Sequence, residues 1–255
     1  MSTMKDIDSI SLSIDSLHHG YLKLSYQDRR PATLGLAAVN AVLLAAGVRV
    51  SQVDIPKDAI PILKASMYRK LSVEDHDELI SLFPLHRGEL LEEIERAGRT
   101  PEMHRGGFMS TAEYGGTPYP KVVDMKAISA DDLPDFQARL GKLHSNSSED
   151  GAGIDEVMTI VSGGGSVWFF RLLDNSVVKL TLGAVDPGGK AWRISYPGLG
   201  IHGTYLNSEN GILIAYAHGP RSFVVRYYDA SIDGSELLGT NPWLDFSGKI
   251  PSLLD

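Results

Sequence analysis

The chain has 255 residues, of which 43% are hydrophobic and 22% are charged, and it contains no cysteine. This length and composition are typical of a globular protein with one large domain or two small ones. The absence of cysteine excludes disulfides, thiolate metal sites, iron–sulfur clusters and a cysteine nucleophile. The net charge of −8 opposes binding to a phosphate backbone, so we expect no nucleic-acid partner.

The N-terminal residues MSTMKDIDSI lack the basic and then apolar segment of a secretion signal. The longest apolar region, residues 34–48, is too short to span a bilayer. We therefore expect a cytoplasmic protein without a membrane partner.

The first predicted elements are short strands and one helix. Residues 9–15 and 21–26 both alternate apolar with polar side chains, which predicts a β-hairpin. The next segment has Pro31 near its start and Gly47 at its end, which are typical positions for these residues in a helix. A predicted strand that ends at Pro56 follows, and together these elements form a β-β-α-β unit.

Residues 56–99 are predicted to form short helical segments. Ser72 is a suitable N-cap, Pro84 separates two helical pieces, and Gly98 ends the second of them. A DNA-binding helix-turn-helix is one interpretation, but the second helix is acidic and would be repelled from a groove. We expect instead a helical hairpin that packs on the neighbouring strands.

The following region, residues 98–121, is rich in Gly, Pro and Thr and is predicted to be a loop. A strand and a short helix are expected over residues 121–143. From residue 154 onward, short strand-like runs recur about every ten residues between turns, which predicts a sandwich or barrel. We therefore predict a small α+β domain over residues 1–103 and a β-barrel domain over residues 104–255, so that the protein is mainly β.

Three polar side chains in the predicted barrel could form a metal site. Without cysteine, a metal site is built from imidazole and carboxylate ligands, and the arrangement of two histidines and one carboxylate leaves positions open for substrate. His144, Glu156 and His202 occur in a suitable order along the chain. Asp155 is an equal alternative to Glu156, and His218 could replace His144.

The spacing of these residues resembles the motifs of the cupin family. Glu156 is followed by six residues and then Gly163, as in the first cupin motif, and Pro197 precedes His202 by the five positions of the second motif. The family's His-x-His is present here as His144-Ser145-Asn146, so asparagine replaces the second histidine. The interval from His144 to Glu156 is also longer than in the family, which requires an enlarged loop.

The resemblance implies a cupin-like jelly-roll barrel after the small α+β domain. It implies that His144, Glu156 and His202 bind a divalent metal, with iron(II) favoured and manganese, zinc or nickel as alternatives. Asn146 would be a weak fourth ligand or a hydrogen-bond donor to a bound molecule.

Substrate-binding residues are expected on the barrel strands, where alternation turns only about half of the side chains inward. Our candidates besides Asn146 are Arg193, Tyr216 and Arg226. The expected function is a metal-dependent enzyme for a small polar organic substrate, either an iron(II) dioxygenase or an isomerase. The alternative is a non-catalytic module that binds a ligand or mediates assembly. A homodimer is possible through exposed sheet edges.

Overall fold

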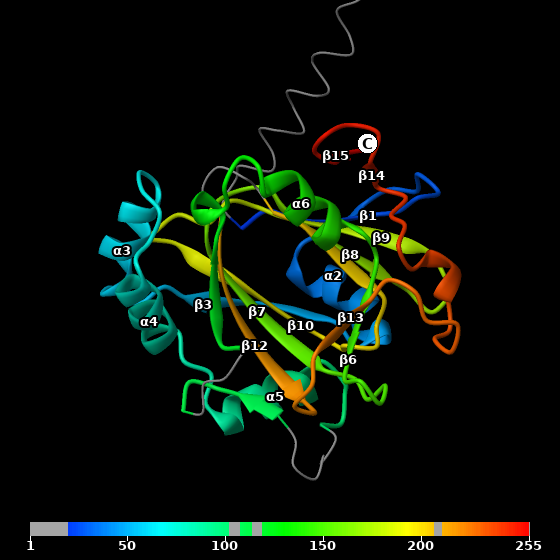
Figure 1. The fold of residues 1–255 in the computed structure, drawn as a ribbon, viewed down its shortest axis with the longest axis horizontal. Helices are drawn as coiled ribbons and strands as arrows, with labels where there is room; N and C mark the ends of the chain where they lie inside the picture. Colours follow the sequence, from blue (N-terminus) through cyan, green and yellow to red (C-terminus); the bar gives the residue numbers. More distant parts are fainter. Residues whose placement is uncertain (1–19, 102–107, 114–118, 207–210, 255) are drawn as a thin grey trace, which may run out of the picture.

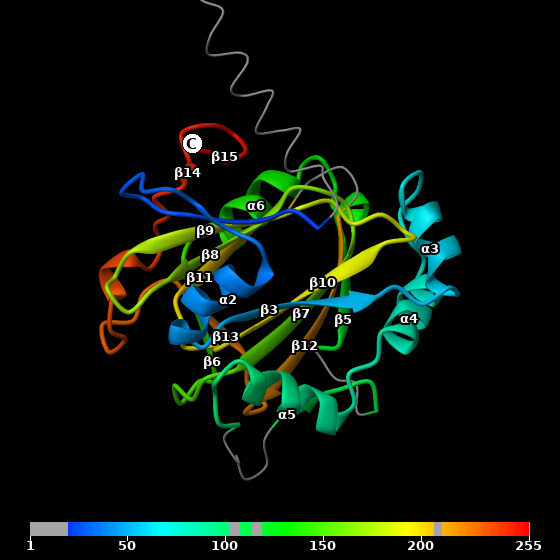
Figure 2. The same cartoon turned by 180° about the vertical axis from the view of Figure 1, so that it is seen from behind.

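The computed structural model describes residues 20–101, 108–113, 119–206 and 211–254. In this part of the chain, two antiparallel β-sheets face each other across a shared core, and helices cover their outer sides and ends (Figures 1 and 2). None of the described helices combines the length and apolar character needed to cross a membrane.

The first sheet contains five strands. In spatial order they are β11 (His202–Tyr205), β8 (Ser166–Arg171), β9 (Val177–Leu182), β1 (Leu22–Ser25) and β2 (Thr33–Leu34). The second sheet contains six strands, and its strand β12 pairs with both β4 and β5 along the same edge. They are β3 (Arg49–Asp54), β10 (Lys190–Tyr196), β7 (Asp155–Ser162), β12 (Ile212–Gly219), β4 (Phe108–Ser110) and β5 (Lys121–Asp124).

Two further strand pairs lie beside these sheets. They are β6 (Ser145–Ser147) with β13 (Val224–Arg226), and β14 (Leu244–Asp245) with β15 (Ser252–Leu253). The described α-helices are α2 (Leu36–Leu43), α3 (Ala59–Ser66), α4 (Val73–Leu82), α5 (Arg87–Arg96) and α6 (Leu133–Gly141). The described 3₁₀ helices are η1 (Leu44–Ala46), η2 (Met125–Ala127) and η3 (Ser235–Leu237).

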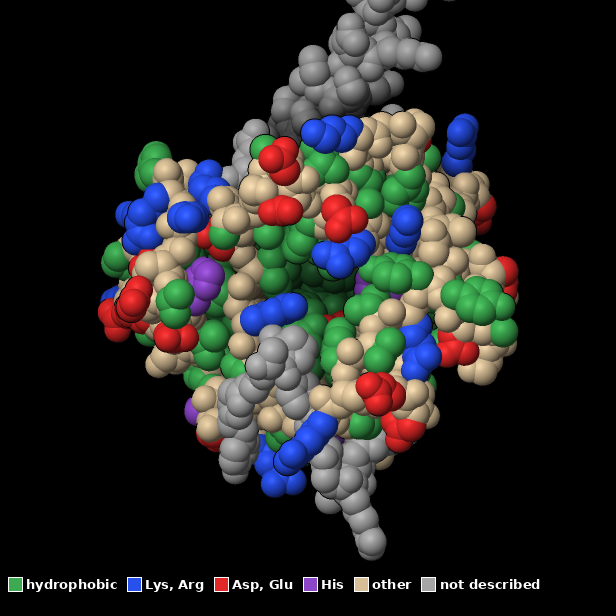
Figure 3. Space-filling view, in the orientation of Figure 1, with side chains coloured by type: hydrophobic (Ala, Val, Ile, Leu, Met, Phe, Trp, Pro, Cys, Tyr) green, Lys and Arg blue, Asp and Glu red, His purple; other side chains and the backbone are tan. Residues whose placement is uncertain are grey.

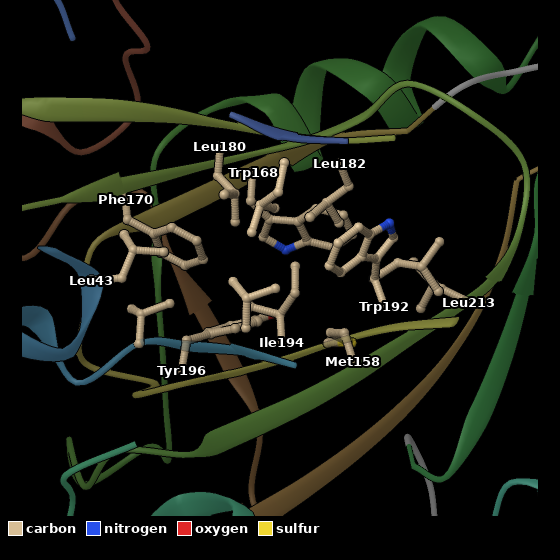
Figure 4. Packing of buried hydrophobic residues seen from close by; sticks show 14 of the residues in the cluster. Leu43, Met158, Trp168, Phe170, Leu180, Leu182, Trp192, Ile194, Tyr196 and Leu213 are labelled. Carbon is tan, nitrogen blue, oxygen red and sulfur yellow. The ribbon is translucent and has the colours of Figure 1, made fainter. Parts of the chain in front are cut away.

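The main core lies between the two sheets. Trp168 and Phe170 of β8 point inward from the first sheet, and Trp192 and Ile194 of β10 point inward from the second (Figure 4). Both sheets have an apolar outer face as well: α3, α4 and α5 cover the second sheet, and the C-terminal segment covers the first. Strands β7, β8 and β12 are therefore buried on both sides, which removes the polar alternation that would show their inward faces.

Several predicted elements are confirmed. The helix predicted to end at Gly47 does so, because Gly47 adopts the left-handed conformation with φ 70°. Ser72 caps α4 in a reciprocal capping box with Asp75. The helix does not begin near Pro31, since residues 33–34 pair with β1 as strand β2. The strand predicted over residues 9–15 lies outside the described residues.

The two sheets combine strands from both sides of the predicted boundary at residue 103. β1 pairs with β9, and β3 pairs with β10. Residues of β1, α2 and β3 belong to the same core as residues of β7 to β12. The division into domains 1–103 and 104–255 therefore runs through both sheets, because hydrogen bonds between distant strands leave no signal in local sequence patterns.

Candidate active-site cavity

Four side chains that the sequence singled out meet in one cavity. His144, Asn146, Glu156 and His202 all line a space of about 160 Å³ between the sheets. Each of the four is at most 5% exposed. Figure 3 shows a hollow on this side of the molecule, with hydrophobic side chains around it and Lys or Arg side chains at its rim.

Strand pairing places the two histidines side by side. His144 and His202 lie directly opposite each other and exchange two backbone hydrogen bonds, of 2.8 and 2.9 Å. Their ring centroids are 4.6 Å apart. Asn146 lies two residues beyond His144 along the same extended segment, so it points to the same side. The His-x-Asn spacing therefore directs both side chains into the cavity.

The turn before His202 needs glycine because of close packing. A Cβ on Gly198 would overlap the backbone carbonyl oxygen of Ile154. The Gly198 carbonyl also accepts a 2.6 Å hydrogen bond from the backbone N–H of Asn146. The turn thus fixes β6 and the start of β7 against the segment that carries His202.

The Asn146 amide connects the carboxylate with one imidazole. Its Nδ2 lies 2.6 Å from Oε2 of Glu156 and 3.2 Å from Nε2 of His202. The Nε2 atom of His202 is 3.6 Å from the same carboxylate oxygen. The amide oxygen Oδ1 of Asn146 is buried and has no hydrogen-bond partner. A buried polar atom of this kind is costly unless something binds to it.

Both imidazoles are oriented by backbone carbonyls. Nδ1 of His144 donates to the Lys142 carbonyl and Nδ1 of His202 donates to the Gly200 carbonyl, each at 2.7 Å. A neutral ring with Nδ1 protonated keeps its lone pair on Nε2, which is the arrangement of a metal-binding histidine. Burial, together with the neighbouring His202, lowers the pKa of His144 to about 3, so this ring is neutral at physiological pH.

Glu156 is held in its anionic form. Burial alone would raise its pKa, but the interactions with the His202 imidazole and with the hydroxyl of Tyr119 hold the pKa below its ordinary value. Tyr119 donates a short hydrogen bond to Oε1 of Glu156. Burial, then the carboxylate, raises the pKa values of Tyr119 and Tyr196 far above the usual range, so both phenols stay protonated.

The rest of the cavity is mostly apolar and has one cationic side chain. Lys121 of β5 is the only Lys or Arg among the described lining residues. Its ammonium group lies 4.9 Å from the ring centroid of Tyr119. Burial lowers the pKa of Lys121, and the attraction of Glu156 opposes this effect. Phe136 and Phe223 are among the apolar side chains of the wall.

The donor set fits a divalent metal only if Asn146 takes part. Within the described residues, no group of three or more His, Asp or Glu side chains could hold a metal ion by itself. The 3.6 Å between Nε2 of His202 and Oε2 of Glu156 suits two ligands that each lie about 2.1 Å from a shared ion. Asn146 faces this pair with its amide nitrogen, so its unpartnered Oδ1 would become a further oxygen donor only with the amide turned over.

The other three predicted substrate-binding residues do not line this cavity. Arg193 lies on the outer face of the second sheet, 3.6 Å from the carboxylate of Glu93 in α5. Tyr216 donates to the Phe83 carbonyl at 3.0 Å, also on the helix-covered face. Arg226 donates to Ser147 Oγ at 2.5 Å, and its neighbour Val225 lines the cavity instead.

The two alternative ligands that the sequence left open do not line the cavity either. Asp155 faces Arg99, 3.2 Å from its Nε, on the other side of β7. His218 and Asp155 both line a separate small pocket beside the Pro197 turn. Strand alternation explains this, because Asp155 and Glu156 are adjacent and point to opposite faces.

Sequence reasoning missed four polar residues of the cavity: Tyr119, Lys121, Tyr196 and Thr204. Tyr119 lies in a segment that was predicted to be a loop, and Lys121 is the first residue of the strand that follows it. No periodic pattern therefore indicated where these two side chains point. The alternation of side chains along β10 could have identified Tyr196. It shares the inward phase of Trp192 and Ile194, and it pairs directly with Glu156 across β10 and β7.

No protein-family model and no curated protein matches the sequence. Among solved structures, the fold is similar to that of acireductone dioxygenase from Bacillus anthracis with a cadmium ion in its active centre. The TM-score is 0.53, the sequence identity is 16%, and the match covers 82% of this chain and 100% of the other. At this level of identity the likeness shows a similarity of fold alone.

Proposed function

We propose that the protein is a divalent-metal-dependent enzyme of the cupin type that oxidises a small organic anion. The observation that carries the proposal is the buried convergence of His144, Asn146, Glu156 and His202, with an unpartnered amide oxygen among them. The fold likeness to a dioxygenase with a metal ion in its active centre adds support. Iron(II) is the favoured ion, with manganese, zinc and nickel as alternatives.

The four side chains would hold the ion through Nε2 of both histidines, a carboxylate oxygen and Oδ1 of Asn146. A bound divalent ion of this kind supplies Lewis acidity, and iron(II) adds redox chemistry with dioxygen. The chain's own residues supply orientation. Lys142 and Gly200 fix the two rings through their carbonyls, and the Tyr119 hydroxyl fixes one oxygen of Glu156.

Lys121 and the apolar wall define the class of substrate. A single cation beside the apolar part of the wall favours a molecule with one anionic group and an apolar body. The wall side chains, including Phe136 and Phe223, exclude water once the space is filled, which strengthens the electrostatic interactions inside it. We infer that the substrate binds with its anionic group toward Lys121 and its reacting part toward Glu156.

A second candidate function is a ligand-binding module without metal. The observation in its favour is that Nδ2 of Asn146 bridges Glu156 and His202, at 2.6 and 3.2 Å. In this arrangement the amide joins the carboxylate to the imidazole by hydrogen bonds, as a cation would join them by coordination. The module would use the same cavity and the same Lys121.

Metal content distinguishes the two functions. The protein is purified anaerobically with iron(II) supplied, and bound metal is measured by mass spectrometry. We expect close to one equivalent of metal in the wild type and a large loss in His202→Ala. The matched control is His76→Ala, a histidine on α4 outside the cavity, which should keep its metal. A wild-type protein without stoichiometric metal would favour the module.

A further inference from the structure

A second depression, with no lining residue in common with the active-site cavity, is lined by residues of β1, of β9 and of the segment just before β14. Figure 1 shows where these three strands lie. The depression is a cleft of about 620 Å³ that includes Trp243 in its wall. None of the described residues that line it is acidic, and four of them are cationic: Lys23, Arg29, Arg30 and Lys179. We propose that this cleft binds a phosphorylated small molecule.

Two of these cations are already held in place by aromatic rings, and Lys179 also donates to the Leu254 carbonyl at 2.7 Å. The guanidinium of Arg30 lies 3.8 Å from the ring centroid of Tyr26, and the ammonium of Lys179 lies 4.5 Å from that of Trp243. Cation–π contacts of this kind reduce the freedom of the side chains before a ligand arrives, so less entropy is lost on binding. Arg30 also lies 3.8 Å from the exposed carboxylate of Asp28, a weak pair that a ligand can displace.

Strand register brings two lysines onto one face. Ser25 pairs with Lys179, and Lys23 pairs with Thr181, so Lys23 and Lys179 are diagonal neighbours on adjacent strands. Lys23 is half-buried. Two ammonium groups on one face of a strand pair attract an anion more strongly than either does alone. The chain as a whole is acidic, with a net charge of −8, which makes this local excess of positive charge more distinctive.

Arg29 occupies a backbone position that suits glycine better. Its φ is 60°, in the left-handed region that few non-glycine residues adopt at low cost. The turn nevertheless carries an arginine, whose planar group can bind two phosphate oxygens at once. A phosphate group carries up to two negative charges and matches several cations better than one carboxylate does. The cleft is much larger than one phosphate, which leaves room for an organic part.

The test uses the full-length protein and inorganic pyrophosphate as the probe, measured by isothermal titration calorimetry at low salt. We expect saturable binding that weakens as salt is added. Arg29→Gly should weaken it about tenfold through loss of a charge-assisted hydrogen bond, with thermal stability unchanged or increased because glycine accepts this φ. Lys23→Gln should also weaken it. Lys57→Gln, before α3 on the other side of the molecule, is the matched control (Figure 1).

The source of the phosphate is tested with glycerol phosphate and with vesicles that contain phosphatidic acid. Binding of the soluble ester supports the proposal. Sedimentation with vesicles in the absence of ester binding would overturn it in favour of a membrane surface. Absence of saturable pyrophosphate binding would overturn it as well, as would binding that both Arg29→Gly and Lys23→Gln leave unchanged.

Discussion

The orientation of the Asn146 amide determines whether the cavity presents a hydrogen-bond donor or a metal ligand to Glu156. Asn146 stands where the resembling family has a second histidine, and its amide nitrogen faces Glu156 while its oxygen is unpartnered. Without a metal ion, the amide N–H donates a hydrogen bond to the carboxylate. With a metal ion between the two side chains, the amide oxygen would coordinate the ion together with the carboxylate. The same side chain is thus compatible with a metal-free and a metal-bound cavity.

Asn146→His is therefore expected to strengthen metal binding. It replaces a weak amide oxygen with an imidazole nitrogen, a preferred ligand of iron, nickel and zinc. We expect the dissociation constant for manganese or nickel to fall by about tenfold or more, a gain of at least about 1.4 kcal/mol. Competition with a metal-chelating dye measures it, and His76→Ala serves as the unchanged reference. An equal or weaker affinity would count against Asn146 as a ligand position.

Lys121→Met tests the class of substrate. Methionine keeps the apolar length of the side chain and removes its charge, so the apolar wall is preserved. We expect binding of 4-methyl-2-oxopentanoate, an anion with an apolar body, to weaken about tenfold, because a charge-assisted contact is lost. The neutral amide of the same acid should bind the two proteins equally. The control is Lys64→Met on the surface of α3.

If Lys121→Met and the wild type bound the acid with equal affinity, the anionic substrate would be refuted, even if the metal site were correct. Titration calorimetry on metal-loaded and metal-free protein separates these two questions.

At the scale of single elements, capping was well predicted because its signal is local. Ser72 Oγ accepts from the backbone N–H of Asp75 at 3.2 Å, and the Asp75 carboxylate accepts from the backbone N–H of Ser72 at 2.8 Å. Arg69 also donates to this carboxylate, at 2.7 Å, and lowers the pKa of Asp75 to about 2. The start of α4 is fixed by these contacts within a few residues, which is why the sequence alone located it.

Ser72→Ala is expected to lower the free energy of unfolding by about 1 kcal/mol, because it leaves one helix N–H without its partner. The matched control is Ser81→Ala on the exposed side of the same helix, which should be neutral or slightly stabilising. Urea denaturation followed by circular dichroism measures both. Equal stability of Ser72→Ala and wild type would mean that the cap contributes nothing to the stability of α4.

The sequence could not predict toward which face of its sheet each strand side chain points. In β12, Ala215 and Ala217 face the main core, whereas Tyr216 faces the helices. In β10, Arg193 faces the same outer side and pairs with Glu93. Because helices cover this outer face, both phases of the strand contain buried side chains. The sequence therefore could not tell which phase faces the cavity, and both Arg193 and Tyr216 were assigned to it.

At the scale of the whole molecule, the first hundred residues are part of the sheets that form the cavity. β1 and β3 extend the two sheets at β9 and β10. Local patterns predicted these strands but not their partners, because pairing across more than a hundred residues depends on the complete fold. The Glu–Gly and Pro–His spacings, by contrast, each lie within one strand or turn, so they can be read from local sequence.

A fragment of residues 104–255 is expected not to fold by itself. Removal of β1 and β3 would expose the edges of β9 and β10 and open the shared core. The fragment should aggregate or lack a cooperative thermal transition in calorimetry, and co-expression with residues 1–103 should restore solubility. A fragment with a sharp transition of its own would show that residue 103 is a true domain boundary.

The central claim of the proposed function is that four side chains from three segments of the chain bind one metal ion. Anomalous diffraction from crystals grown with iron(II) or manganese tests it most directly. The account predicts a single anomalous peak within ligand distance of Nε2 of His144 and His202, the Glu156 carboxylate and Oδ1 of Asn146. A cavity without such a peak, with the Asn146 nitrogen still between Glu156 and His202, would contradict it.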